Sequence, residues 1–245
     1  MSRDTSFLTK ALVAHRGYHN IEKGIPENTM SAFREAIINN LIIELDVHIL
    51  KDGKIVVFHD DNLKRMTNID KNIKDMSYDE IKDIKLLNTN ETIPLFENVL
   101  KLIDGQVPLI IELKHDVKCG ILEPALIKIL KDYNGEYAVK SFNPLTVNYF
   151  RKYSPNTIRG QLSYDFSDKK INKLEKYVLK NMLFNIITKP DFISYGIHSL
   201  PNNKVKKIRK NKLILGWTVK SKEDLEHAKK YCDNFICENI DFNNL

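Results

Sequence analysis

Acidic, basic and imidazole side chains that could cooperate in catalysis recur in four short stretches, His15-Arg16-Gly17, Glu44-Leu45-Asp46-Val47-His48, His59-Asp60 and Glu112-Leu113-Lys114. In an extended strand, residues two apart lie on one face, so Glu44 lies with Asp46 and Glu112 with Lys114. Acids that are brought together repel one another and raise their own proton affinities unless a cation lies among them. Oxygen-only ligands suit Mg²⁺ or Ca²⁺ better than zinc. Glu44, Asp46 and Glu112 are therefore candidate ligands of a divalent metal.

Two cationic residues and two histidines accompany these acids. The planar guanidinium of Arg16 suits phosphate oxygens, and Lys114 adds a point charge. A bound divalent cation would also neutralise and polarise a phosphate. Histidine exchanges protons near neutral pH, so His15 and His59 could serve as base and acid on the attacking and leaving oxygens. This combination describes phosphodiester cleavage.

Each of these residues also has a simpler interpretation. A strand Glu usually pairs with a nearby cation, and Glu112 could do only that with Lys114. His48 shares the face of Glu44 and Asp46, but a metal that already has oxygen ligands does not require it, so its role stays open. The functional interpretation gains weight because these residues recur at the ends of predicted strands.

Short apolar runs alternate with helical patterns along the whole chain. The predicted strands are 11–15, 41–46, 109–113, 137–141, 158–162, 192–195, 213–219 and 234–237. The predicted helices include 29–39, 96–103, 123–133, 145–153, 169–184, 203–211 and 222–231, with Asn28 and Ser221 as expected N-caps. Eight strands that alternate with helices indicate a (β/α)8 TIM barrel with catalytic groups at the carboxyl ends of its strands. A doubly wound open sheet is the alternative, but no GxGxxG follows a strand.

One stretch interrupts this alternation. Residues 47–58 resemble a β-ribbon that turns at Lys51-Asp52-Gly53, and a loop-rich segment follows from Lys64 to Leu95. A short helix is expected within it near 79–86. We interpret residues 64–95 as a small insertion over one end of the barrel, because long excursions in compact domains usually form lids or binding loops when they are ordered.

Length and composition fit a single domain over residues 1–245. Three cysteines without a CxxC pair, no signal-peptide pattern and no apolar run of membrane-spanning length favour a cytoplasmic location. The net charge of +6 could attract anionic partners, but a well-solvated basic surface is the simpler interpretation. The run Lys204–Lys212 predicts an amphipathic surface helix, and nucleic-acid binding is not expected.

At the four stretches around His15, Glu44, His59 and Glu112, the chain closely resembles the glycerophosphodiester phosphodiesterase family. The resemblance runs from about Leu12 to Ile240 as an ordered set of motifs: AHRG (14–17), PENT (26–29), AF (32–33), ELDV (44–47), KDG (51–53), VVFHD (56–60), Leu63, RMT (65–67), IPL (93–95), ELK (112–114), SF (141–142) and WTV (217–219). No single motif is specific, but the ordered combination is.

The resemblance implies a TIM-barrel hydrolase that converts glycerophosphodiesters to sn-glycerol 3-phosphate and an alcohol. Under this resemblance Glu44, Asp46 and Glu112 hold the divalent cation, and His15 and His59 form the acid/base pair. Arg16 and Lys114 lie on the phosphate, and Trp217 lies near the glycerol moiety unless it is only a core aromatic residue. The expected partner is a small-molecule substrate, with transient membrane-surface contact allowed and the oligomeric state open.

Three positions depart from the family pattern, Leu50, Lys220 and Cys237-Glu238. None is an expected metal, acid/base or phosphate residue, and the last two concern substrate preference. Three alternatives to glycerophosphodiester hydrolysis remain at this stage. The first is a lysophospholipase D-type hydrolase of lipid phosphodiesters. The second is a catalytically silent binding module, which the intact set of His, acidic and Lys residues disfavours. The third, ranked last, is a nucleic-acid binder based on Lys204–Lys212.

Overall fold

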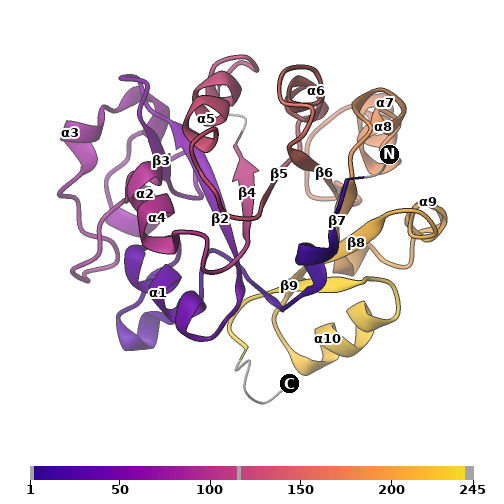
Figure 1. Ribbon diagram of the computed structural model, residues 1–245, viewed down its shortest axis with the longest axis horizontal. Coiled ribbons are helices and arrows are strands. Elements are labelled where there is room, and N and C mark those ends of the chain that lie inside the picture. Colours follow the sequence, from indigo (N-terminus) through magenta and orange to yellow (C-terminus); the bar gives the residue numbers. More distant parts are fainter. Residues whose placement is uncertain (1–2, 115–116, 241–245) are drawn as a thin grey trace. The chain divides into compact units, whose positions relative to one another are not determined.

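The computed structural model describes residues 3–114 and 117–240, and helices and strands alternate along the chain (Figure 1). The chain groups into two compact units, one formed by Ala14–Tyr137 and the other by the remainder. None of the described helices combines the length and the apolar character needed to cross a membrane.

The unit Ala14–Tyr137 is built on strand β2 (Ile42–Ile49), in which every residue is buried. Strand β4 (Leu109–Leu113) pairs with β2 in parallel orientation, and β3 (Ile55–Val57) pairs with β2 in antiparallel orientation. The helices of this unit are η2 (Ile21–Lys23), α1 (Met30–Ile38), α2 (Lys64–Thr67), η3 (Ile73–Asp75), α3 (Tyr78–Ile81), α4 (Phe96–Ile103) and α5 (Leu122–Leu130). A strand that is buried on both faces is expected where helices cover a parallel sheet.

Two details of this unit differ from the sequence prediction. The second strand does not end at Asp46 but continues to Ile49, where it forms half of the predicted ribbon with β3. Helix α1 is capped by Thr29, whose side chain accepts a hydrogen bond from the Ala32 amide. Asn28, the expected cap, has a φ of 56°, and its side chain donates to Asp46 instead of capping the helix.

The segment between Lys64 and Leu95 is folded around apolar side chains of its own. Its helices are short, and α3 begins with a capping box between Ser77 and Glu80. These apolar residues pack in one buried cluster with the ribbon, a cluster that contains Leu50, Val56, Phe58, Leu63, Met66, Ile73, Met76, Ile81, Leu86 and Ile93. Burial of these side chains holds the segment in place against β3.

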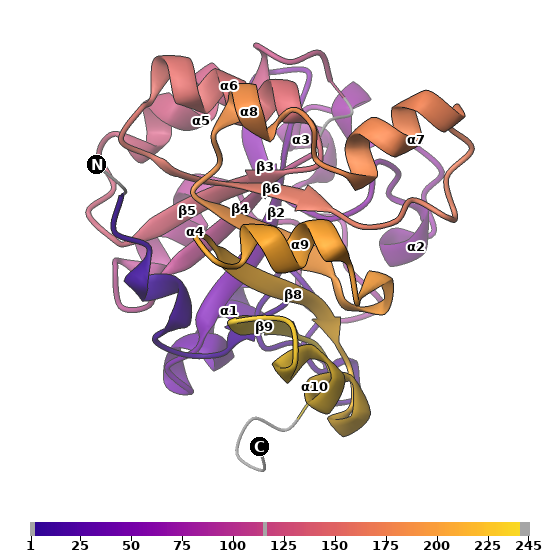
Figure 2. The same cartoon turned by 90° about the vertical axis from the view of Figure 1, so that its right-hand side faces the viewer.

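The other unit contains five parallel strands in sequential order, β5 (Tyr137–Ser141), β6 (Ile158–Ser163), β7 (Phe192–Gly196), β8 (Leu213–Val219) and β9 (Asn234–Cys237) (Figure 2). Strand β1 (Val13–Ala14) links the two units along the chain. The helices are η1 (Ser6–Thr9), α6 (Pro144–Tyr153), α7 (Lys173–Lys180), α8 (Asn185–Thr188), η4 (Ile197–Ser199), α9 (Asn203–Ile208) and α10 (Lys222–Lys229). Ser221 caps α10 through the Asp224 amide, as predicted.

Candidate active site

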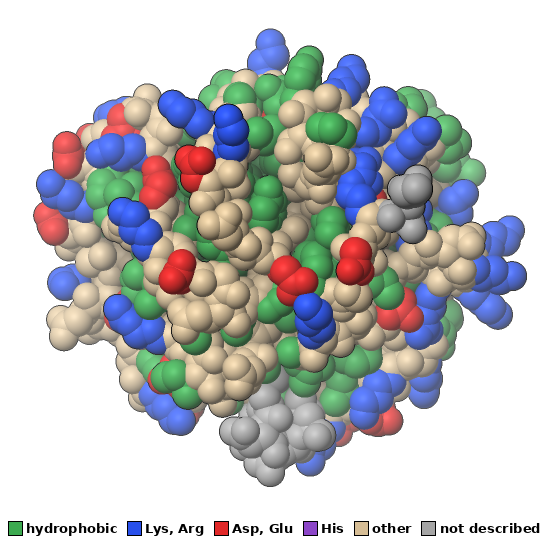
Figure 3. Space-filling model, in the orientation of Figure 1, with side chains coloured by type: hydrophobic (Ala, Val, Ile, Leu, Met, Phe, Trp, Pro, Cys, Tyr) green, Lys and Arg blue, Asp and Glu red, His purple; other side chains and the backbone are tan. Residues whose placement is uncertain are grey.

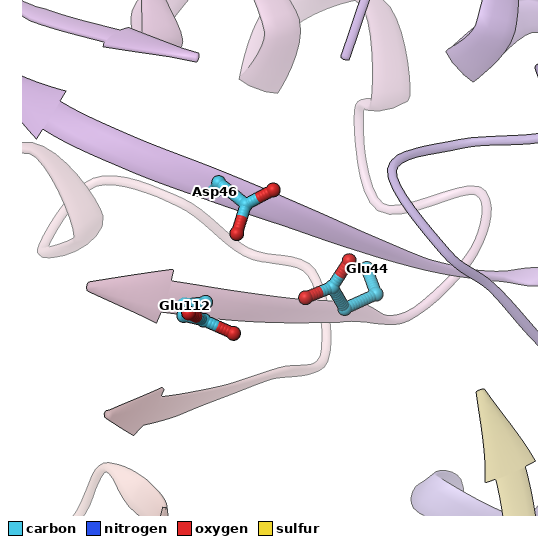
Figure 4. Close-up of side chains that lie close together, drawn as sticks. All are labelled: Glu44, Asp46 and Glu112. Carbon is cyan, nitrogen blue, oxygen red and sulfur yellow. The ribbon is translucent and has the colours of Figure 1, made fainter. Parts of the chain in front are cut away.

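Three acidic side chains meet on neighbouring strands. In the register of β2 and β4, Asp46 lies directly opposite Glu112, and Glu44 is two residues earlier on the same face of β2. One carboxylate oxygen from each residue lies within 4.8 Å of the others, and all three residues are buried (Figure 4). The structure therefore brings together the three acids predicted as metal ligands.

Lys114 lies between two of these acids. Its Nζ is 2.7 Å from Asp46 Oδ1 and 2.7 Å from Glu112 Oε1. Burial disfavours the charge on Asp46, but Lys114, His59 and Arg16 together hold the pKa of this carboxyl well below its usual range. Burial likewise opposes the charge on Lys114, and Asp46 and Glu112 nevertheless raise its pKa. Asp46 and Lys114 are thus charged together.

The loop after β1 wraps around Glu44. Arg16 has a φ of 57°, and its backbone amide donates to Glu44 Oε2 at 3.0 Å. Gly17, with a φ of 80°, donates to the Glu44 carbonyl oxygen at 3.2 Å. A Cβ at Gly17 would lie 2.9 Å from Ala32, so only glycine fits this close turn.

The Arg16 guanidinium faces acids on two sides. Its Nε lies 3.6 Å from Asp46 Oδ2, and one of its terminal nitrogens donates to Glu27 Oε1 at 2.7 Å. Burial works against the charge of Arg16, but Asp46, Glu27 and Glu44 raise its pKa. His15 precedes this residue in the same loop and is partly exposed.

His59 is held by its neighbour in the sequence. Its Nδ1 lies 2.6 Å from Asp60 Oδ1. His48 is fully buried, and its Nε2 lies 3.3 Å from the His59 carbonyl oxygen. His48 therefore contacts the backbone of His59.

Four residues that hydrogen-bond around these groups, Glu27, Asn28, Asp60 and Arg65, were not among the residues predicted for catalysis, metal binding or phosphate binding. Asn28 donates from Nδ2 to Asp46 Oδ2 at 2.9 Å and so orients one of the three acids. Asp60 could have been found from its place beside His59. Asn28 was hidden because an Asn before a helix usually indicates a cap.

Arg65, from α2, joins two acids of the network. It donates to both oxygens of Asp60, at 2.6 and 3.1 Å, and to both oxygens of Glu27, at 2.6 and 3.1 Å. Burial would raise the pKa of Glu27, but Arg65 and Arg16 lower it. Burial acts in the same way on Asp60, and His59 and Arg65 lower its pKa. Arg65 thus connects the acid beside Arg16 with the acid beside His59.

Trp217 belongs to the other unit, where it lies in an aromatic cluster. Its ring centroid is 5.6 Å from that of Phe142 and 5.8 Å from that of Tyr164, and Phe166 lies 4.2 Å from Tyr164. Among the described residues, no partner accepts a hydrogen bond from the buried Nε1 of Trp217. Lys220 and Glu238, two departures from the family pattern, form an ion pair at 3.3 Å at the ends of β8 and β9.

Solved structures share this fold over nearly the whole chain. An Oleispira antarctica phosphodiesterase in complex with the product sn-glycerol-3-phosphate superposes with a TM-score of 0.76 at 21% identity, covering 94% of this chain and 93% of that one. A glycerophosphodiester phosphodiesterase from Thermotoga maritima has a TM-score of 0.71 at 24% identity, covering 93% and 94%. The predicted (β/α)8 barrel is confirmed.

Sequence comparison gives the family. A glycerophosphodiester phosphodiesterase from Caldanaerobacter subterraneus is 33% identical over 236 residues, which cover 89% of each chain. A human lysophospholipase D is 34% identical over 146 residues, 54% of this chain and 44% of that protein. Residues 15–240 match the family described as glycerophosphoryl diester phosphodiesterases, so the chain belongs to the glycerophosphoryl diester phosphodiesterase family.

Proposed function

We propose that this chain hydrolyses glycerophosphodiesters to sn-glycerol 3-phosphate and an alcohol, in a reaction that depends on a divalent metal. The observation that carries the proposal is the buried cluster of Glu44, Asp46 and Glu112, with Lys114 on two of its members. Family membership and the named activity of the Caldanaerobacter relative support the same reaction. The product bound to the Oleispira enzyme supports sn-glycerol 3-phosphate as the phosphate product.

The residues present fit a divalent cation. Three buried carboxylates without a sulfur or nitrogen ligand are the donor set of a hard ion such as Mg²⁺ or Ca²⁺. Glu44, Asp46 and Glu112 would hold this ion, which when bound supplies charge neutralisation and polarisation of a phosphate. Asn28 keeps Asp46 oriented.

The remaining residues bind the phosphate and move protons. Arg16 and Lys114 bind its oxygens by charge-assisted hydrogen bonds. One of His15 and His59 takes the proton of the attacking oxygen, and the other gives a proton to the alcohol oxygen as its bond to phosphorus breaks. The hydrogen bond that Nδ1 of His59 donates to Asp60 leaves Nε2 as the nitrogen that exchanges the proton.

Trp217 and its aromatic neighbours are proposed to contact the organic part of the substrate. The human lysophospholipase D supports a second candidate, hydrolysis of lysophospholipids by the same residues. Turnover of lysophosphatidylcholine compared with glycerophosphocholine separates the two candidate activities.

Two further expectations from the sequence stay predictions. One is the cytoplasmic location, and the other is the assignment of residues 1–245 to one barrel domain with an insertion at about 64–95.

The direct test is turnover of glycerophosphocholine with Mg²⁺ or Ca²⁺, with and without a chelator. We expect release of sn-glycerol 3-phosphate only with metal, and its loss in Glu112→Gln. Glu226→Gln is the matched control, because Glu226 pairs with Lys229 on the exposed face of α10. Turnover that resists the chelator would refute the metal dependence, and no turnover of any phosphodiester by the folded, metal-loaded chain would support a silent binding module.

A further inference from the structure

The segment of α7 and α8, between β6 and β7, exposes an unusual number of large hydrophobic side chains. Of the twelve such residues that are exposed in the described part of the chain, six lie between 174 and 187. Leu174 is 73% exposed and Ile186 is 81% exposed. The set is Leu174, Tyr177, Leu183, Phe184, Ile186 and Ile187. Exposed apolar residues that gather in one segment often mark an interaction site.

Helix α7 is oriented so that these side chains stay outside. Leu174 and Tyr177 are three residues apart, on one face of a helix that has no fully buried residue. Its other side is held to the protein, because Ser163 donates to the Leu179 carbonyl at 3.0 Å and Met182 is buried in the core. Helix α8 packs against α6 with Thr188 inward and Ile186 and Ile187 outward. The apolar face is thus fixed in position.

The segment that carries these apolar residues is rich in lysine. The sequence from 165 to 189 contains six lysines, Lys169, Lys170, Lys173, Lys176, Lys180 and Lys189, but only three acids, Asp165, Asp168 and Glu175. No ion pair within 4.0 Å joins any of these lysines to an acid in the described part of the chain. In Figure 3 hydrophobic and cationic side chains lie side by side over α7 and α8.

We propose that α7 and α8 form a docking surface for a membrane that contains anionic phospholipids. The exposed apolar side chains would enter the interface between headgroups and acyl chains, and the lysines would contact the anionic headgroups. A second copy of the chain fits less well, because two such faces would bring twelve lysines together. A nucleic acid would attract the lysines but would leave Leu174 and Ile186 without a role.

The position of α7 connects this surface to the aromatic cluster. The chain leaves the carboxyl end of β6 through Tyr164 and Phe166, which belong to the cluster around Trp217, and reaches α7 a few residues later. A membrane on α7 would therefore lie near the carboxyl ends of these strands, the end at which barrel enzymes bind their substrates. The proposed membrane-docking surface goes beyond the proposed hydrolysis and does not depend on it.

The test is co-sedimentation of the full chain with phosphatidylcholine vesicles and with vesicles that also contain phosphatidylglycerol. We expect binding only to the anionic vesicles. The double variant Leu174→Ser/Ile186→Ser should weaken this binding about tenfold or more, and so should the triple variant Lys169→Glu/Lys170→Glu/Lys173→Glu. All of these residues are exposed, so the variants should fold.

Two matched controls keep the test specific. Ile38→Ser/Leu145→Ser removes exposed apolar residues elsewhere, and Lys204→Glu/Lys206→Glu/Lys207→Glu reverses three lysines on α9; both should bind vesicles like the wild type. The proposal is overturned if the wild type ignores anionic vesicles or if the α9 variant loses binding equally. It is also overturned if the variant Leu174→Ser/Ile186→Ser binds anionic vesicles like the wild type. The same holds if the wild type is a dimer and this variant is a monomer. Turnover of glycerophosphocholine is measured separately, so a failure of the proposed activity leaves this result interpretable.

Discussion

Arg65 and Asp60 are joined by two hydrogen bonds, from Nε to Oδ2 at 2.6 Å and from a terminal nitrogen to Oδ1 at 3.1 Å. Asp60 also accepts a hydrogen bond from Nδ1 of His59, a proposed catalytic residue. Arg65, on α2, therefore fixes the carboxylate that orients the His59 imidazole. The same guanidinium holds Glu27, the partner of Arg16. Arg65, in the segment between Lys64 and Leu95, thus joins a residue proposed for proton transfer to a residue proposed for phosphate binding.

Arg65→Ala is expected to lower kcat by about 100-fold, because loss of the guanidinium frees Asp60 and lets His59 leave its position. Arg65→Lys should restore only part of the activity, since lysine cannot bond both acids with the same geometry. Lys64→Ala is the matched control: its side chain is on the same helix but pairs with exposed Asp70.

A double-mutant cycle separates positioning from general destabilisation. If Arg65 acts through Asp60, the loss of kcat in Arg65→Ala should be much smaller in an Asp60→Asn background. Additive losses in kcat, or a loss matched by Lys64→Ala, would contradict the positioning role.

His15→Ala and His59→Ala should each lower kcat by about 10²–10⁴-fold, the usual contribution of a general acid or base. Metal affinity, measured by calorimetric titration, should stay close to that of the wild type in both variants. His198→Ala is the control, because His198 is 78% exposed on η4. Full activity in His15→Ala or in His59→Ala would remove that residue from the proposed pair.

Lys114→Met is expected to destabilise the metal-free protein by about 3–5 kcal/mol, because two buried carboxylates lose their shared cation. Saturating Mg²⁺ or Ca²⁺ should recover much of this loss, since an ion bound by the same acids replaces the lost charge. Urea unfolding with and without metal measures both values. An equal loss of stability with and without metal would argue against a cation site at these acids.

Asn28→Gly should weaken metal binding by about 10–100-fold, because Asp46 loses the amide that orients it. Glycine accepts the positive φ of this position, so the substitution removes the side chain without backbone strain. Asn68→Gly is the matched control, since Asn68 has a similar φ of 64° at the end of α2 but no contact with the three acids in the structure. An unchanged affinity in Asn28→Gly would show that Asp46 does not need this support.

Where local pattern decides the structure, the sequence predicted it well. Strands β4, β5, β8 and β9 and helix α4 have the predicted bounds, because short apolar runs between turn residues have few other conformations. The period of two placed Glu44 with Asp46, and Glu112 with Lys114, on shared faces. By contrast, the predicted helix 169–184 is shorter, since Asn172 caps α7 before Lys173 and Met182, with a φ of 52°, follows its end.

The sequence by itself determined which residues are candidates for chemistry and which of them share a face of a strand, because side-chain type and alternation are local properties. Only the tertiary structure decided that Asp46 lies opposite Glu112, that Asn28 supports Asp46 instead of capping a helix, and that Arg65 reaches Glu27. Register between strands and contacts between distant side chains depend on how whole elements pack, and no local pattern records that packing.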